Sequence, residues 1–225
     1  SDPVERLDLG VVPSPYLSGL LDPFLEQENL SPIIETNRGC PYACTFCVWG
    51  QAVGSKLRQF NLDTVDQEIH YIAERAANPT KVLYVADANF GMLPRDKEIA
   101  ETMMLCRESN GFPMRLAAST AKNPTPHTLD TAEILSPIAT MSMSLQSTDE
   151  RVLKFVGRNN IRIDKYDAIR RETRARGIQT FCELIYGLPG ESYETFLKGL
   201  IDTTRSGQFV QMYEHHLLWG AEGSS

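Results

Sequence analysis

Residues 32–47 read PIIETNRGCPYACTFC and join a short apolar run to a loop with three cysteines. The run over 32–36 carries β-branched side chains and predicts a buried strand. Cys40, Cys44 and Cys47 crowd into eight residues, whereas the other two of the five cysteines stand alone. An odd number with this spacing does not form a disulfide framework. In a reducing compartment such crowding is typical of metal ligation or redox chemistry, so the stretch predicts a strand followed by a chemically active loop.

Downstream of this stretch, short apolar or β-branched runs alternate with amphipathic segments of helical length. The expected strands are 32–36, 81–86, 114–120, 139–146, 180–186 and 209–215. The expected helical crossovers are 62–77, 95–110, 126–135, 149–176 (two helices) and 192–206. Six strands joined by five crossovers predict a parallel α/β sheet, open or curled into a full or partial barrel.

Residues 1–31 precede this alternation and are interrupted by four prolines, Pro3, Pro13, Pro15 and Pro23. We therefore expect an N-terminal linker segment over 1–31 that wraps a core domain over 32–225. The chain stops about ten residues after the sixth expected strand, with no further helix to cover it. From this we expect a fragment of a longer protein.

The composition of the 225 residues excludes several classes of protein. With 42% apolar and 23% charged residues, the chain resembles a globular domain and not a disordered or fibrous chain. The net charge of −7 argues against nucleic acid and anionic membranes as partners. No apolar run approaches the ~20 residues of a spanning helix, and the N-terminus does not resemble a signal peptide. We therefore expect a cytoplasmic protein that binds neither nucleic acid nor membranes.

The fourth and fifth expected strands carry polar side chains where a covered parallel sheet should be apolar on both faces. Ser142, Ser144 and Gln146 alternate with apolar residues, so all three share one face. That face predicts the lining of a wet cavity, although hydroxyls satisfied near a strand end would also explain it. Glu183 lies among apolar neighbours, on the face opposite Cys182, where a carboxylate needs a partner. We expect Glu183 to face substrate or cofactor.

The spacing C-x3-C-x2-C suits three corners of a cubane iron–sulfur cluster, with the fourth iron left open for a ligand. Electron-transfer ferredoxins supply four cysteines to each cluster, and structural zinc sites close their shell with four ligands. No fourth cysteine or histidine lies near the loop, the next being His70 and Cys106. Two alternatives stay open: a zinc site completed from a distant part of the chain, and unpaired buried thiols.

Residues 40–47, CPYACTFC, with Phe46 directly before the third cysteine, resemble the signature of the radical S-adenosylmethionine (radical SAM) superfamily. The resemblance covers 32–218 and implies a partial, TIM-like (β/α)6 barrel of parallel strands that lacks the last helix. It also implies that Cys40, Cys44 and Cys47 hold a [4Fe–4S] cluster whose open iron binds SAM. In this family the reduced cluster cleaves SAM to methionine and a 5′-deoxyadenosyl radical. The alternative is a non-catalytic iron–sulfur electron-transfer or metal-binding module.

The resemblance also assigns SAM contacts to individual residues. Asp87 and Asn89, after the second expected strand, correspond to the family's site for the SAM amino group, although an Asx turn or helix cap would need no ligand. Arg158 resembles the arginine that pairs with the SAM carboxylate; the alternative is a solvated helix-end arginine. The stretch 185–191 resembles the adenine site, which a tight strand-to-helix turn also explains. The expected cofactor-binding residues are Phe46, Asp87, Asn89, Ser119, Ser144, Gln146, Arg158, Glu183, Ile185 and Gly187.

Residues 12–22, VPSPYLSGLLD, resemble the linker between a cobalamin-binding domain and the barrel in cobalamin-linked radical SAM enzymes. The base-off cobalamin signature Asp-x-His-x-x-Gly does not occur in the chain, so we expect cobalamin only through a domain outside it. The resemblance implies methylation, or another C–H functionalisation, of an unknown small molecule or peptide. It also implies a reductant such as flavodoxin or ferredoxin. The methylthiotransferase branch is disfavoured, because it needs a second three-cysteine cluster.

Overall fold

The computed structural model describes residues 8–49, 56–121, 123–161, 163–205, 207–219 and 221. Within them, two three-stranded sheets follow each other along the chain, and every strand pairing in both is parallel. The first sheet has the order β1 (Ile33–Ile34), β4 (Val82–Phe90) and β5 (Arg115–Thr120), and the second has the order β6 (Met141–Ser142), β7 (Thr180–Tyr186) and β8 (Phe209–Glu214). The prediction of six parallel strands is confirmed.

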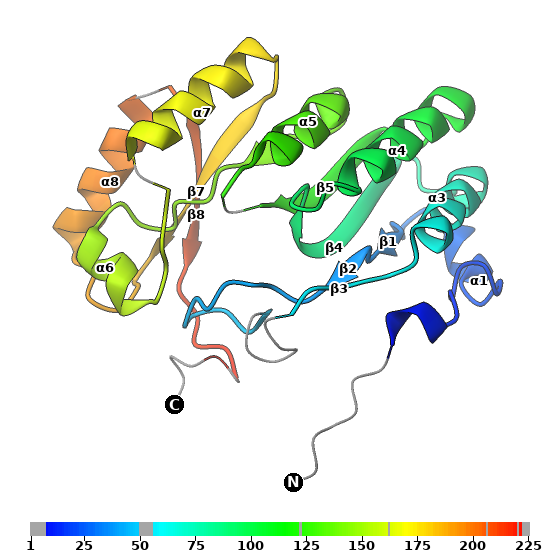
Figure 1. The fold of residues 1–225 in the computed structure, drawn as a ribbon, viewed down its shortest axis with the longest axis horizontal. Helices are drawn as coiled ribbons and strands as arrows, with labels where there is room; N and C mark the ends of the chain where they lie inside the picture. The colour runs from blue at the N-terminus through cyan, green and yellow to red at the C-terminus, as the bar shows by residue number, and fades with distance from the viewer. Residues whose placement is uncertain are drawn as a thin grey trace, which may run out of the picture.

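The longer helices lie on the outer side of the strands and form an arc around them (Figure 1). They are α3 (Leu62–Arg75), α4 (Asp96–Asn110), α5 (Pro126–Leu135), α6 (Glu150–Phe155), α7 (Ile163–Ala175) and α8 (Tyr193–Arg205). They fall within the five expected crossovers, and 149–176 holds two helices as predicted. One helical layer around a curved strand layer is a partial barrel. None of the described helices has the length and hydropathy to cross a membrane.

The two sheets adjoin between β5 and β6. The Thr120 Oγ1 donates to the backbone oxygen of Ser142 at 2.7 Å, and the Leu116 amide donates to the Ile138 oxygen at 2.9 Å. The strand layer therefore continues from one sheet to the next.

Two expected strands are shorter than predicted. The run 32–36 forms a strand only over β1, and 139–146 only over β6. After β6 the chain still follows β7: the Met143 amide donates to the Phe181 oxygen and the Gln146 amide to the Glu183 oxygen, both at 2.8 Å. Three steps along this segment therefore match two along β7, which is a bulge. The bulge ends at Gln146, whose φ is +66°.

Strand β4 is longer than predicted and continues past residue 86 to Phe90. Its register with β5 shifts between Val85, which pairs with Ala118, and Phe90, which pairs with Thr120. Residues 86–89 therefore bulge out of the ladder. The prediction that Asp87 and Asn89 follow this strand is wrong, since both lie on its bulge.

A small antiparallel ribbon was not expected from the sequence. It pairs β2 (Asn37–Arg38) with β3 (Arg58–Gln59), and the three cysteines lie in the chain between them. The ribbon closes the base of the cysteine loop, which extends toward α6 (Figure 1).

The largest apolar core lies between β1, β4 and β5 on one side and α3 and α4 on the other. The N-terminal segment, with a 3-10 turn at Leu9–Val11 and α1 (Asp22–Leu25), packs on the same core. Tyr16 and Leu25 are buried in this core, and the Tyr16 hydroxyl donates to the Ile33 oxygen at 2.7 Å. Each such apolar side chain contributes about 1.5–3 kcal/mol on burial.

Candidate functional site

A cavity of about 350 Å³ opens where the cysteine loop, the β4 bulge and the inner faces of β6 and β7 meet. All the site residues predicted from the sequence line it, except Ile185 and Gly187. The side chains that line it come from segments more than 100 residues apart in the chain. The cavity is therefore a product of the barrel and not of one motif.

The cysteine loop is held against the segment that follows α6. The Thr45 amide donates to the Val156 oxygen, and the Cys47 amide to the Cys44 oxygen, both at 3.0 Å. Gly157 makes the close approach possible: its φ is +60°, and a Cβ there would lie 3.0 Å from the Ala43 oxygen. Cys40 and Cys44 are buried, and Cys47 is half-buried. All three line the cavity.

The sulfurs of Cys40 and Cys44 accept side-chain hydrogen bonds from other elements. Asn89 Nδ2, on the β4 bulge, lies 3.3 Å from Cys40 Sγ. Arg158 Nη1 lies 3.7 Å from Cys44 Sγ. Donors aimed at sulfur suit thiolates, which carry the negative charge of a metal-bound cysteine.

Arg158 is buried, with 7% of its surface exposed. Its Nε donates to Asn160 Oδ1 at 2.8 Å, and its Nη2 donates to the Ser144 oxygen. Burial lowers the pKa of Arg158 from its usual value, but a guanidinium keeps its charge in proteins. The alternative of a solvated helix-end arginine is wrong, since the side chain lies at the cavity wall.

The Asp87 carboxylate, 2% exposed, is occupied by donors of the chain itself. Its Oδ1 accepts from the amides of Thr36 (2.7 Å) and Asn37 (3.2 Å), and its Oδ2 accepts from the Asn37 side chain (2.6 Å) and the Thr36 hydroxyl. Burial raises the pKa of Asp87, and the hydrogen bonds from Thr36 oppose that shift. Four donors match the four acceptor positions of a carboxylate. Asp87 thus holds the turn from β1 into β2, the entrance to the cysteine loop.

Three polar side chains on the second sheet face the cavity. The Ser144 hydroxyl donates to Glu183 Oε2. Gln146 Oε1 is buried and has no hydrogen-bond partner among the described residues, which leaves a buried acceptor that a donor from a ligand can satisfy. Met141, Met143 and Leu145 are buried on the opposite side, so the predicted division of this segment into a polar and an apolar face is confirmed.

Ser119 lines the cavity at the end of β5, next to Thr120. The Thr120 Oγ1 lies 2.8 Å from the Ser142 Oγ, so these two hydroxyls partner each other.

Ile185 and Gly187 lie outside the cavity lining. Ile185 packs with Phe46 against Val152, Val156 and Leu188. Gly187, with φ +82°, begins the turn from β7 to α8. This apolar cluster lies directly behind the cysteine loop.

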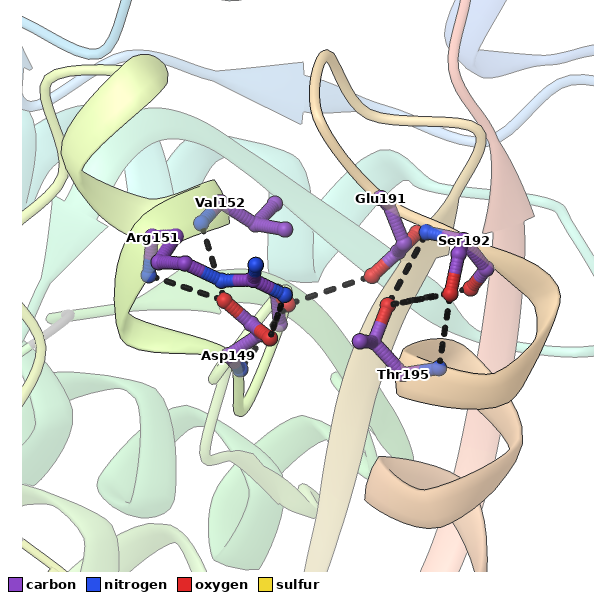
Figure 2. A network of polar contacts seen from close by, with 7 residues as sticks. Asp149, Arg151, Val152, Glu191, Ser192 and Thr195 are labelled. Atoms are coloured by element: carbon purple, nitrogen blue, oxygen red, sulfur yellow. Dashed lines mark hydrogen bonds and ion pairs between the residues drawn. The ribbon is translucent and has the colours of Figure 1, made fainter.

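The turn from β7 to α8 is held by its own hydrogen bonds. The Ser192 amide donates to Thr195 Oγ1 at 2.9 Å (Figure 2). Nearby, Asp149 caps the start of α6 by accepting from the Arg151 and Val152 amides. Glu191 Oε1 accepts from the Ser147 hydroxyl at 3.1 Å, and burial raises the pKa of Glu191. The network joins the start of α6 to the start of α8 beside the cavity.

Sequence reasoning missed Tyr42, Trp49 and Thr120, which also line the cavity. Tyr42 and Trp49 belong to the cysteine loop, and their closeness in sequence to the three cysteines was the available signal. Thr120 gave no signal of its own, because its position depends on how β5 meets β6.

The donor set fits a thiolate-bound cluster. Among the described residues, no three His, Cys, Asp or Glu side chains are arranged around a single metal ion. A cubane cluster makes a different demand, because each thiolate binds a different iron. Three cysteines on one cavity wall, with an amide and a guanidinium donating to two of their sulfurs, meet that demand.

Known proteins resemble this chain in sequence. It matches the Radical SAM superfamily over residues 34–200. It is 36% identical to 2-(S-pantetheinyl)-carbapenam-3-carboxylate methyltransferase of Streptantibioticus cattleyicolor, over 96% of this chain and 33% of that protein. It is 35% identical to the cobalamin-dependent radical SAM methyltransferase TokK of Streptomyces tokunonensis, over 92% of this chain and 31% of that protein. The chain thus spans about a third of the length of these curated relatives.

The fold also matches solved structures. The radical S-adenosylmethionine methyltransferase TsrM from Kitasatospora setae, solved with cobalamin and a [4Fe–4S] cluster bound, aligns with a TM-score of 0.66 at 20% identity. The alignment covers 82% of this chain and 34% of that one, and at this identity it shows the fold alone. The family match covers most of the chain, including the cysteine loop and the cavity. The chain therefore belongs to the radical SAM superfamily, whose enzymes use a [4Fe–4S] cluster and S-adenosylmethionine.

Proposed function

We propose that this chain is the catalytic core of a cobalamin-linked radical SAM methyltransferase that functionalises a C–H bond of a small molecule. The observation that carries the proposal is the convergence of the three cysteines with Asn89 and Arg158 on one cavity of about 350 Å³. That volume lies in the range of small-ligand sites, about 300–1,000 Å³. The two curated relatives at 35–36% identity, both methyltransferases by name, favour methylation.

Cys40, Cys44 and Cys47 hold the cluster in this proposal. When bound and reduced, the cluster supplies the electron that splits SAM into methionine and a 5′-deoxyadenosyl radical. Phe46, which belongs to the loop, packs on the apolar cluster around Val152. This contact anchors the loop against the segment that contains α6. The chain's own contribution is to hold the three thiolates in place at the cavity wall.

Arg158 binds the SAM carboxylate in this proposal. Three of the five guanidinium N–H groups are used by Asn160, Ser144 and Cys44, which leaves two donors for a carboxylate. The buried positive charge makes an anionic ligand group favourable at this wall.

Ser144, Gln146 and Glu183 bind the polar part of SAM, with Ser119 opposite them. Glu183 has a second carboxylate oxygen beyond the one bonded to Ser144, and Gln146 has its unpartnered oxygen, so both accept hydrogen bonds from hydroxyl or ammonium groups. Ile185 and Gly187 border the adenine in this proposal. Asn89 and Asp87 line the remaining wall of the cavity. Asp87 acts there by holding the turn from β1 into β2.

The first experiment is anaerobic reconstitution with iron and sulfide, followed by SAM and a strong reductant, with 5′-deoxyadenosine quantified. We expect product from the intact chain and none from Cys44→Ala. A cubane cluster with no SAM binding and no product would favour the alternative, an electron-transfer module. A flavodoxin or ferredoxin then replaces the chemical reductant to identify the electron donor.

Methyl transfer is tested with this chain joined to the cobalamin-binding domain that the proposal calls for. The S-pantetheinyl carbapenam named for the Streptantibioticus cattleyicolor relative is the first substrate to try. A mass increase of one CH2 unit, as a methyl group replaces a hydrogen, supports the proposal if it requires cobalamin. Radical formation with no methylated product from it would leave the cleavage of SAM standing and refute this substrate.

A further inference from the structure

The donors to Cys40 and Cys44 come from outside the cysteine loop and are themselves held in place. Asn89 is 5% exposed and lies on the β4 bulge, so it belongs to the first sheet and not to the loop. Arg158 is tied to Asn160 and to the Ser144 backbone. Both donors therefore reach the cysteine sulfurs from elements other than the loop.

Reduction adds one negative charge to a cluster and its thiolates. Hydrogen bonds to the sulfurs and the net charge nearby set the reduction potential of an iron–sulfur cluster. A donor that is already oriented stabilises the added charge without reorganisation. Arg158 adds a full positive charge, and its burial reduces the screening of that charge by solvent.

One carboxylate, Glu183, lies close enough to Arg158 to oppose this effect in part. No ion pair between Arg158 and a carboxylate exists among the described residues, and its neighbours Asn160 and the Ser144 oxygen are neutral acceptors. Glu183 acts on Arg158 without a direct contact, and its Oε2 accepts from the Ser144 hydroxyl. The contact of Arg158 Nη1 with Cys44 Sγ at 3.7 Å keeps the positive charge beside that sulfur.

We propose that Asn89 and Arg158 raise the reduction potential of the [4Fe–4S] cluster by hydrogen-bonding to Cys40 and Cys44 and by placing a buried positive charge beside Cys44. This proposal rests on the cluster assignment above and adds a second role to Arg158, beyond the SAM carboxylate. Asn89 is a positioning residue with a redox role and not an acceptor for the SAM amino group. The two residues make the cluster easier to reduce before SAM binds.

The test is the midpoint potential of the reconstituted cluster without SAM, measured by redox titration followed by EPR, with iron and sulfide contents as a loading check. Arg158→Met removes the charge and the donor at similar length. We expect the reduced-to-oxidised ratio at a fixed potential to fall about tenfold, which corresponds to about 59 mV for one electron. Arg158→Lys keeps the charge and should keep most of the potential.

Variants of Asn89 provide a second, independent test of the effect on the reduction potential. Asn89→Leu removes the donor at similar volume and should lower the ratio about threefold, and Asn89→Asp, which adds a negative charge, should lower it further. Arg151→Met is the matched control, because its side chain is 75% exposed on the neighbouring helix α6, where solvent screens the charge. We expect no change of potential in that variant.

Potentials equal to wild type in Arg158→Met and Asn89→Leu would overturn the proposal. If Arg158→Met loads no cluster, Asn89→Leu and Asn89→Asp decide alone, and an unchanged potential in both would also overturn it. Loss of 5′-deoxyadenosine formation with unchanged potentials would assign Arg158 to SAM only, which refutes this inference but not the proposed function. A wild-type chain that assembles no cubane cluster would refute both.

Discussion

The two halves of the barrel differ in how they are stabilised. The half built on β1, β4 and β5 buries one continuous apolar core with α3 and α4. The half built on β6, β7 and β8 has three smaller apolar clusters, and its last strand is largely exposed, with Phe209 at 71%. The inner face of this second half carries Ser144, Gln146 and Glu183 in place of apolar packing. The first half therefore has the larger apolar core and carries the cysteine loop, and the second half lines the facing wall of the cavity with polar side chains.

The largest effect on cluster assembly should come from the cysteine loop, which belongs to the first half and packs against the second. Cys44→Ala removes one of three thiolates and should abolish cluster assembly, because a cluster held at two corners is lost from the loop. Cys106→Ala is the control, since Cys106 is buried in the first core away from the cavity. Iron and sulfide analysis after reconstitution measures both. Full loading of Cys44→Ala would refute the ligand assignment.

A matched pair of leucines compares the two cores directly. Leu83 in β4 and Leu184 in β7 are both fully buried. Leu83→Ala should lower the free energy of unfolding by about 2–5 kcal/mol. Leu184→Ala should cost less, because the smaller cluster around it can relax into the space left behind. Urea unfolding measures both, and an equal or larger cost at Leu184 would break the comparison.

Asp96 should make the stability of the first half depend on pH. The side chain is fully buried at the start of α4 and accepts from the amides of Gly91 (2.9 Å) and Leu93 (3.0 Å). Burial raises its pKa from 3.8 to about 6. The folded state therefore binds the proton more tightly than the unfolded state, and the free energy of unfolding falls as pH rises from about 4 to about 6, by up to about 3 kcal/mol.

Asp96→Asn should remove this pH dependence. Thermal or urea unfolding between pH 4 and 7 measures the slope in both proteins. The same slope in Asp96→Asn as in wild type would show that another group titrates there.

Asp87→Asn separates support of the loop from contact with SAM. The amide would place N–H groups where Thr36 and Asn37 already donate, and each buried donor left without an acceptor costs about 1–3 kcal/mol. We expect lower stability and lower cluster loading together. If stability and loading are unchanged while the affinity for SAM falls in a binding titration, Asp87 contacts the SAM amino group instead.

Gly157→Ala tests the contact between the halves. A left-handed φ costs a non-glycine residue about 1–2 kcal/mol, and the new Cβ would also press on the Ala43 oxygen. Gly177→Ala is the matched control, because Gly177 has φ +73° and nothing within 4 Å of a Cβ. The loss of stability and of iron loading in Gly157→Ala beyond that in Gly177→Ala measures the contact between Gly157 and the Ala43 oxygen. Equal losses in the two variants would mean that this contact is not tight.

Local patterns in the sequence determined the helices, the succession of strands along the chain and the cysteine loop. Helical periodicity and strand composition are properties of neighbouring residues, so 62–77, 95–110 and 126–135 could be predicted closely. The spacing of Cys40, Cys44 and Cys47 is likewise a local feature, and it carried the family resemblance.

Only the tertiary structure decided what each polar side chain does. Asp87 is saturated by Thr36 and Asn37 because β1 and β4 pair side by side, a contact across about fifty residues that no local pattern encodes. The bulges in β4 and before Gln146 depend on the register with partner strands. From the sequence, the Arg158 side chain could be solvated or buried. Its burial results from the packing of the cysteine loop against it. Long-range pairing and burial, which depend on the whole chain, therefore decided the site.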